Sequence, residues 1–268
     1  MTIRLRQLPR SLAESAEPDL LIGSAGSIIA LLRLGEVAGD PCWLQLAESV
    51  GERLLDAGCR VTGTLHWRSA RSPEGLGGFA HGSTGIGWAL ARLSIASGRA
   101  EFMAAADAAF AFEQTLWRPD TQSWLDARGL EGPEVATGWC HGAAGIGLAS
   151  LDLLGRSCDG TTDHSSVVRR AAAACWSQGM GRSHSLCHGD LACWELLAGA
   201  HSVGLGPPVV TRDDVGGYLL ASLAQQGPVT GTGRGVFSPG LLPGLAGIAY
   251  QLLRMHLDCD LPSVLLPG

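Results

Sequence analysis

Two cysteine–histidine pairs are the residues of this sequence best suited to chemistry, because thiols and imidazoles are side chains that bind zinc readily. Cys140 and His141 lie in the stretch TGWCHGAAGIG, and Cys187 and His188 lie in the stretch SLCHGDL. Three such side chains with an open fourth position would form a catalytic zinc site. The chain contains no Cys-x-x-Cys pair, so two alternatives stay open at this point: a nucleophile with its base, or ordinary core residues.

Both pairs stand at the start of a repeated element. Glycine, two residues and a second glycine open an apolar segment at Gly23, Gly82, Gly142 and Gly244, and a copy at Gly189 has Ala192 in place of the second glycine. A recurring element at intervals of 47 to 60 residues indicates a repeat architecture. Residues three apart lie on one helix face, so the two glycines are expected to let a neighbouring backbone approach closely.

Each repeat unit is predicted to contain an inner and an outer helix. The segments that follow the glycines are apolar almost all round, which is typical of buried helices. The segments between them carry their charges on one face, which is typical of surface helices; they are Cys42–Gly58, Glu101–Trp117, Ser166–Gly179 and Asp213–Gln226. Stacking such units in a circle gives an all-α fold, an α/α toroid with the N-termini of about five visible inner helices on one face.

The loops before two of the inner helices are long, spanning residues 60–82 and 118–142. Each contains an aromatic-centred stretch that favours a short hairpin, TLHWR and QSWLD. Long loops on a rigid scaffold often carry function. Asp19 and His81 also stand just before inner helices, so we expect their side chains to converge with the two cysteine–histidine pairs.

Composition limits the classes of function. The formal net charge is −6 and all 19 basic residues are arginine, which argues against a general nucleic-acid-binding protein. No apolar run reaches the roughly 18 residues of a membrane span and the N-terminal stretch lacks the apolar core of a signal peptide, so we expect a cytoplasmic protein without stable membrane insertion. Disulfides are then not expected, and six of the eight cysteines are interpreted as structural: Cys42, Cys59, Cys158, Cys175, Cys193 and Cys259.

The motifs FAHGSTG, WCHGAAGIG, SLCHGDL and SPGLLPGLAGIAYQLLRM, in this order, resemble those of the lanthionine synthetase C-like cyclase family. The resemblance is greatest to the C-terminal cyclase domain of class II lanthipeptide synthetases, and it covers nearly the whole chain from DLLIGSAG onward. It implies a barrel of about seven inner–outer helix pairs. We therefore expect residues 1–268 to form one partial cyclase domain, an incomplete seven-unit barrel without the N-terminal repeats and without a dehydratase domain.

The resemblance also implies which residues act. It assigns a zinc ion to Cys140, Cys187 and His188, and a catalytic role to His81 in the motif HG-x-x-G. Asp19, four residues before the first glycine pair, matches an acidic residue that orients or polarises this histidine. His141 is interpreted as a bystander, because the implied ligand set is complete without it. Two further histidines are candidates for substrate contact, His66 and His184.

The implied activity is thioether ring formation in lanthipeptides, a class of modified peptides that includes bacteriocins. A cysteine thiol of a dehydrated precursor peptide adds to dehydroalanine or dehydrobutyrine and forms (methyl)lanthionine. A free thiol is mostly protonated near neutral pH, since its pKa is about 8.5, and coordination to Zn²⁺ deprotonates it. An imidazole such as that of His81 can deliver the proton that the enolate carbon needs after the addition.

Two other functions are weighed. One is a catalytically inactive zinc-binding scaffold of the same fold, which acts as a partner or regulatory module, for example beside a dehydratase. The other is an unrelated α/α-toroid enzyme such as a glycoside hydrolase or a terpenoid cyclase, which needs paired carboxylates or an aspartate-rich metal motif at the toroid mouth. The adjacent acid pair of the sequence, Asp213 and Asp214, begins an outer helix instead, which disfavours this class.

Overall fold

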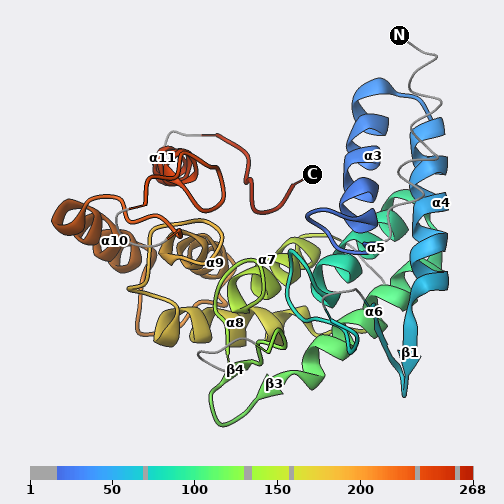
Figure 1. The fold of residues 1–268 in the computed structure, drawn as a ribbon, viewed down its shortest axis with the longest axis horizontal. Helices are drawn as coiled ribbons and strands as arrows, with labels where there is room; N and C mark the ends of the chain where they lie inside the picture. Colours follow the sequence, from blue (N-terminus) through green and yellow to red (C-terminus); the bar gives the residue numbers. More distant parts are fainter. Residues whose placement is uncertain are drawn as a thin grey trace.

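The computed structural model describes residues 17–68, 72–129, 135–156, 160–232, 236–256 and 260–267. Within these ranges the helices alternate between inner and outer positions along an arc (Figure 1). The inner helices are α3 (Ser24–Ala38), α5 (Ser83–Ser97), α7 (Ala143–Leu154), α9 (Asp190–Ser202) and α11 (Leu245–Met255). The outer helices are α4 (Cys42–Ala57), α6 (Ala100–Thr115), α8 (His164–Gln178) and α10 (Arg212–Gln226).

Both long loops contain an antiparallel hairpin, as their aromatic stretches predict. The first hairpin pairs β1 (Cys59–Val61) with β2 (Thr64–His66), and the second pairs β3 (Trp117–Arg118) with β4 (Ser123–Trp124). Each hairpin follows an outer helix and leads into the loop before the next inner helix. The two hairpins therefore set where the loops that carry the candidate site residues begin.

Each inner helix begins at a glycine N-cap that makes no side-chain hydrogen bond. Instead, the N–H of the first helical residue donates to the carbonyl of the residue seven places earlier, so the loop folds back under the helix and satisfies one of its free donors. The five pairs are Ser24 to Glu17 (3.0 Å), Ser83 to Leu76 (2.8 Å), Ala143 to Ala136 (3.2 Å), Asp190 to Ser183 (2.7 Å) and Leu245 to Ser238 (2.8 Å). The same turn thus precedes all five inner helices.

The second glycine of the repeated pair packs on this turn. A Cβ atom added at Gly85 would lie 1.8 Å from the carbonyl oxygen of Phe79, and one added at Gly145 would lie 2.0 Å from that of Trp139. The backbone that approaches is therefore the preceding loop of the same unit, rather than a neighbouring helix. Ala192 occupies the matching position of the fourth unit and is fully buried, so that unit accommodates a methyl group there.

The Gly145→Ala substitution is expected to destabilise the protein by about 1–3 kcal/mol, because the added methyl group must displace the loop that carries Cys140. Thermal unfolding followed by circular dichroism measures the change. Gly217→Ala is the matched control, since Gly217 lies within α10 and a Cβ atom there would meet no atom within 4 Å. The control should keep or slightly raise the stability; an equal loss in both variants would contradict the steric explanation.

Backbone hydrogen bonds join the loops of successive units just before their inner helices. Residues are numbered here by their distance from the N-cap glycine, so Cys140 and Cys187 both occupy position −2 of their units. The N–H at position −2 donates to the carbonyl at position −2 of the next unit: Leu21 to Ala80 (3.0 Å), Ala80 to Cys140 (3.0 Å), Cys140 to Cys187 (3.3 Å) and Cys187 to Leu242 (3.0 Å). This seam ladder holds equivalent residues of adjacent units side by side.

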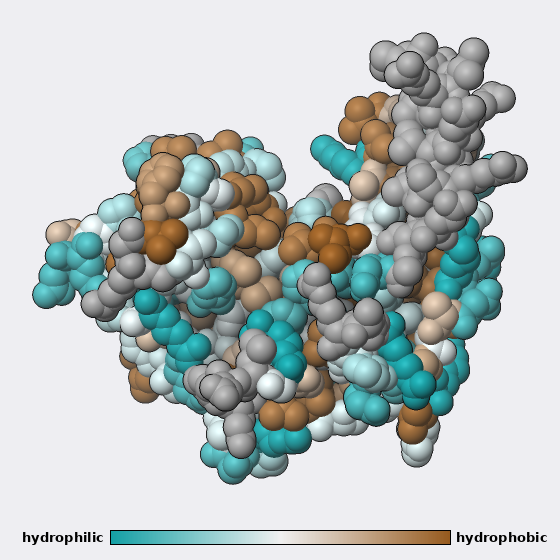
Figure 2. All heavy atoms as spheres, viewed as in Figure 1, coloured by the Kyte–Doolittle hydropathy of each residue, from teal (hydrophilic) through white to brown (hydrophobic). Residues whose placement is uncertain are grey.

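The middle inner helices form the core of the arc. α5 and α7 are buried on almost all sides, with Trp88 and Ile146 among the largest enclosed side chains. The inner helices at the two ends keep apolar side chains at the surface, such as Leu34 of α3 and Leu253 of α11. Figure 2 shows apolar surface between these ends, where the start of α3 and the loop before α11 line a hollow of about 680 Å³.

Six of the eight cysteines lie within the described ranges, and all six are free thiols: Cys42, Cys59, Cys140, Cys175, Cys187 and Cys193. Cys175 and Cys193 are buried in the core. The interpretation of Cys158 and Cys259 as structural concerns residues outside the described ranges. Among the helices of these ranges, none combines the length and the apolar character that a membrane crossing requires.

Candidate metal centre and adjoining pocket

The ligand atoms of Cys140, Cys187 and His188 lie within 4.8 Å of one another. The seam ladder explains this convergence, because it places the two cysteines at position −2 of adjacent units, and His188 follows directly at position −1. Two sulfurs and one imidazole nitrogen form a donor set that suits zinc with a fourth position open to substrate. The structure thus brings together the three residues that the sequence predicts as metal ligands.

A backbone contact orients the imidazole of this cluster. His188 Nε2 lies 3.0 Å from the carbonyl oxygen of Gly231, and a carbonyl can only accept, so Nε2 carries the proton and Nδ1 is left as the ligand atom. Gly231 is held in turn by its own N–H, which donates to the carbonyl of Pro243 (2.7 Å). Metal-binding histidines typically donate their second ring N–H in this way.

The two thiols and the imidazole interact strongly. The hydrogen bond with the Cys187 thiol is the main cause that lowers the pKa of Cys140 to about 4, although burial opposes it. The same bond raises the pKa of the Cys187 thiol, and the hydrogen bond with Cys140 raises the pKa of His188. The pair thus releases one proton readily and holds the second, because two adjacent thiolates repel. A divalent cation offsets this repulsion, so the donor set fits a zinc ion.

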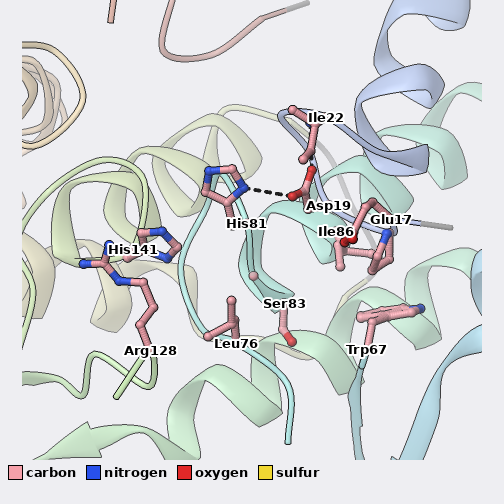
Figure 3. A pocket seen from close by; sticks show the side chains of 12 residues that line it. Glu17, Asp19, Ile22, Trp67, Leu76, His81, Ser83, Ile86, Arg128 and His141 are labelled. Carbon is pink, nitrogen blue, oxygen red and sulfur yellow. Dashed lines mark hydrogen bonds and ion pairs between the residues drawn. The ribbon is translucent and has the colours of Figure 1, made fainter. Parts of the chain in front are cut away.

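An aspartate–histidine pair lies next to this cluster. His81 Nδ1 lies 2.8 Å from Asp19 Oδ2, and Asp19 Oδ1 accepts the N–H of Ile22 at 2.8 Å. The carboxylate is buried and therefore rigidly held. Because Nδ1 of the imidazole is engaged, Nε2 is the nitrogen free to exchange a proton with a substrate (Figure 3). The structure thus brings the two predicted catalytic residues together.

A pocket of about 330 Å³ opens beside this pair. Its wall includes Asp19, His81, His141 and Arg128, together with the apolar side chain of Trp67. Figure 3 shows His81 between Asp19 and His141, with the guanidinium of Arg128 on the far side of His141. The pocket therefore reaches from the Asp–His pair toward the unit that carries the first thiol.

His141 lies in this wall rather than among the three clustered donors. Its ring stacks on that of His81, with centroids 5.1 Å apart and an interplanar angle of 22°. Burial lowers the pKa of His141, and the charge of Arg128 adds to this effect, although the Cys140 thiolate opposes it. Its Nδ1 is buried and has no hydrogen-bond partner among the described residues. The residue interpreted as a bystander of the metal thus contacts the predicted acid–base residue.

Arg128 and its partner Asp126 are the site residues that the sequence reasoning missed. Arg128 donates from Nε to Asp126 Oδ1 (2.8 Å) and from Nη2 to Asp126 Oδ2 (2.5 Å). The hydrogen bond with Asp126 is the main cause that raises the pKa of Arg128, and the charges of both clustered thiols add to it. The signal in the sequence is only an Asp-x-Arg in a long loop, which is too common to indicate a site.

The two histidines predicted as substrate contacts lie elsewhere. His66 is buried and stacks on Phe112 at 4.9 Å. His184 is buried as well, and both of its ring nitrogens are engaged: Nε2 lies 2.9 Å from Ser222 Oγ, and Nδ1 accepts the N–H of Val229 at 2.9 Å. Neither residue lines the pocket beside His81.

Comparisons with known proteins identify the family and the fold of this chain. The family described as "Lanthionine synthetase C-like protein" matches residues 3–266. Among solved structures, nisin cyclase is similar with a TM-score of 0.63 and 17% sequence identity, over 91% of this chain and 64% of nisin cyclase. The chain thus spans less than two thirds of the length of nisin cyclase, and this likeness confirms the predicted fold, an all-α toroid. No curated protein sequence matches the chain. Because the family match covers nearly the whole sequence, this chain belongs to the lanthionine synthetase C-like family.

Proposed function

We propose that this chain is a zinc-dependent lanthipeptide cyclase. It adds cysteine thiols of a dehydrated precursor peptide to dehydroalanine or dehydrobutyrine and forms (methyl)lanthionine rings. One observation carries the proposal: an Asp–His pair lines a pocket, and a Cys₂His donor set lies in the units that follow it, joined to the pair by the seam ladder and by the stack of His141 on His81. The first arrangement suits activation of a thiol, and the second suits delivery of a proton.

Cys140, Cys187 and His188 would hold the zinc ion. When bound, the ion would keep a substrate thiol deprotonated near neutral pH and close to the pocket. The contact of His188 with the carbonyl of Gly231 supports this assignment, because it fixes the ring with Nδ1 free. The substrate thiol would occupy the fourth position that the three protein donors leave open.

His81 would carry the proton. Its Nδ1 is held by the buried carboxylate of Asp19, so that carboxylate fixes the ring orientation. After the thiol has added, the carbon next to the carbonyl group needs a proton, and Nε2 of His81 is the group that supplies it. A dehydratase, as a partner protein or a further domain, would deliver the dehydrated peptide.

An inactive zinc-binding scaffold is the second candidate. The exposed apolar side chains at the two ends of the arc favour it, because apolar surface of this kind is typical of an interface. Such a scaffold would hold the metal and bind a partner without turning over a peptide.

The test is incubation of the purified, zinc-loaded chain with a dehydrated peptide that contains cysteine. Cyclisation adds no mass, so the loss of alkylatable thiols, followed by mass spectrometry after treatment with iodoacetamide, reports ring formation. We expect about one zinc per chain and thiol loss well above the uncatalysed rate. A zinc content below about 0.2 per chain would contradict both the cyclase and the zinc-binding scaffold. A full zinc content with thiol loss at the uncatalysed rate would contradict the cyclase and leave the scaffold as the function.

A further inference from the structure

The guanidinium of Arg128 is a preorganised hydrogen-bond donor at the proposed active site. Arginine has five N–H donors, and Asp126 engages one on Nε and one on Nη2. The backbone N–H of Arg128 donates to the same carboxylate at 3.2 Å, so the side chain is fixed by a contact within its own loop. Among the described residues the guanidinium has no other hydrogen-bond acceptor, and three of its N–H groups are available to a ligand.

The position of Arg128 joins the two halves of the site. It lines the pocket together with His81 and His141. His141, its neighbour in the pocket wall, directly follows Cys140, the first of the clustered thiols. A substrate whose thiol reaches the clustered sulfurs and whose reacting carbon faces His81 would therefore pass in front of this guanidinium.

We propose that Arg128, aligned by Asp126, hydrogen-bonds the carbonyl oxygen of the dehydroalanine or dehydrobutyrine residue and stabilises the negative charge that forms there. This inference rests on the proposed cyclase function and adds a third catalytic group to it. Asp126 is then a positioning residue, since it acts only through the orientation of Arg128.

The chemistry of the addition explains the need for such a donor. The lone pair of the thiolate sulfur forms the bond to the β-carbon, and the π pair of the C=C bond moves toward the carbonyl group. Negative charge therefore collects on the carbonyl oxygen as an enolate. The proton that the thiol gave up is matched by the proton that His81 gives to the α-carbon, which restores the C=O bond. Thiol and alkene thus become a thioether with no atom gained or lost.

A donor that acts on this developing charge should affect the chemical step more than binding. Fixed donors at an oxyanion contribute about 10²–10³-fold to kcat, because their bond strengthens as charge develops. A donor that merely holds the peptide would change KM and leave kcat unaltered. The side chain of Arg128 is about one third exposed (35%), so its loss removes little packing.

The experiment compares the Arg128→Gln variant with the wild type in the zinc-loaded chain. The cyclisation rate is measured over a range of concentrations of a dehydrated cysteine peptide. Binding of the same peptide with its cysteines alkylated is measured separately by isothermal titration calorimetry. We expect kcat to fall about 10²–10³-fold, while zinc content and the affinity for the alkylated peptide stay within about threefold of wild type.

Arg118→Gln is the matched control. Arg118 lies in β3 of the hairpin that leads into the same loop, and it does not line the pocket. This variant removes the same charge and should keep the wild-type rate. If Arg128→Gln lowers the zinc content, Asp126→Asn is tested instead. This variant keeps the guanidinium of Arg128 and removes only the carboxylate charge that orients it, so kcat should fall about tenfold.

Three results would overturn the inference. One is a kcat of Arg128→Gln within threefold of wild type at full zinc. The second is a loss confined to peptide affinity, which would assign Arg128 to binding. The third is a wild-type chain that holds zinc and does not cyclise, which overturns the proposed function itself and this inference with it. That last failure is visible without any substitution, so the two failures are distinguishable.

Discussion

Cys187→Ala should abolish both metal binding and cyclisation. Zinc content is expected to fall from about one per chain to below about 0.1 after dialysis, because two donors cannot replace three. Thiol loss from a dehydrated peptide should then fall to the uncatalysed rate. The variant is expected to fold, since Cys187 is only partly buried and its backbone, not its side chain, takes part in the seam ladder. Zinc is measured by inductively coupled plasma mass spectrometry, and folding by circular dichroism.

Cys59→Ala is the control for this substitution. Cys59 is also a partly buried free thiol, but it lies in β1, away from the three clustered donors. Its loss should leave zinc content and cyclisation unchanged. Retention of a full zinc equivalent in Cys187→Ala would show that the metal binds elsewhere, and the assignment of the ligand set would then be wrong.

His81→Asn should separate proton delivery from metal binding. We expect zinc content to stay at about one per chain, because His81 is not one of the clustered donors. The cyclisation rate should fall about 10²–10⁴-fold, which is the usual contribution of a general acid or base. Asp19→Asn should give a smaller loss of the same kind, since the imidazole remains but is less firmly oriented. Steady-state kinetics at saturating peptide measures both variants.

His201→Asn provides the comparison for His81→Asn. His201 lies in the last turn of α9, at the opposite end of an inner helix from the loops that carry the site. The same substitution there should leave the cyclisation rate unchanged. A rate for His81→Asn within threefold of wild type, at full zinc, would remove His81 from the reaction.

The residues at the start of the inner helices could be predicted because their spacing from a glycine is fixed. Cys140, Cys187, His188 and His81 stand one or two places before an N-cap glycine, and the same turn precedes each inner helix. Because the turn is repeated, residues at the same distance from the N-cap glycine occupy equivalent positions in every unit. The repeat alone therefore predicts that these side chains lie close together. The boundaries of the outer helices were less well predicted: α8 begins at His164 because Asp163 caps it, two residues before the expected start.

Arg128 could not be predicted, because it has no fixed spacing from an N-cap glycine. It lies in the long loop after the second hairpin, where no periodicity relates sequence position to spatial position. Its location depends on a hydrogen bond to Asp126 two residues away and on the packing of a whole unit against the next. The stack of His141 on His81 was missed similarly, because it joins side chains of two units and depends on the spacing between them.

In this toroid, the residue types at positions −1 and −2 of adjacent units determine where a cluster of metal donors forms. Position −1 is histidine in three successive units, at His81, His141 and His188, yet within the described part of the chain only the last of these joins a cluster of three donors. The difference lies at position −2 of the preceding unit, which is Cys140 before His188 and Ala80 before His141. A single exchange, Ala80→Cys, would therefore place the same three donor types at the neighbouring seam. The ladder aligns the backbones of both seams alike, so the side chains at positions −2 and −1 decide which seam carries a cluster of donors.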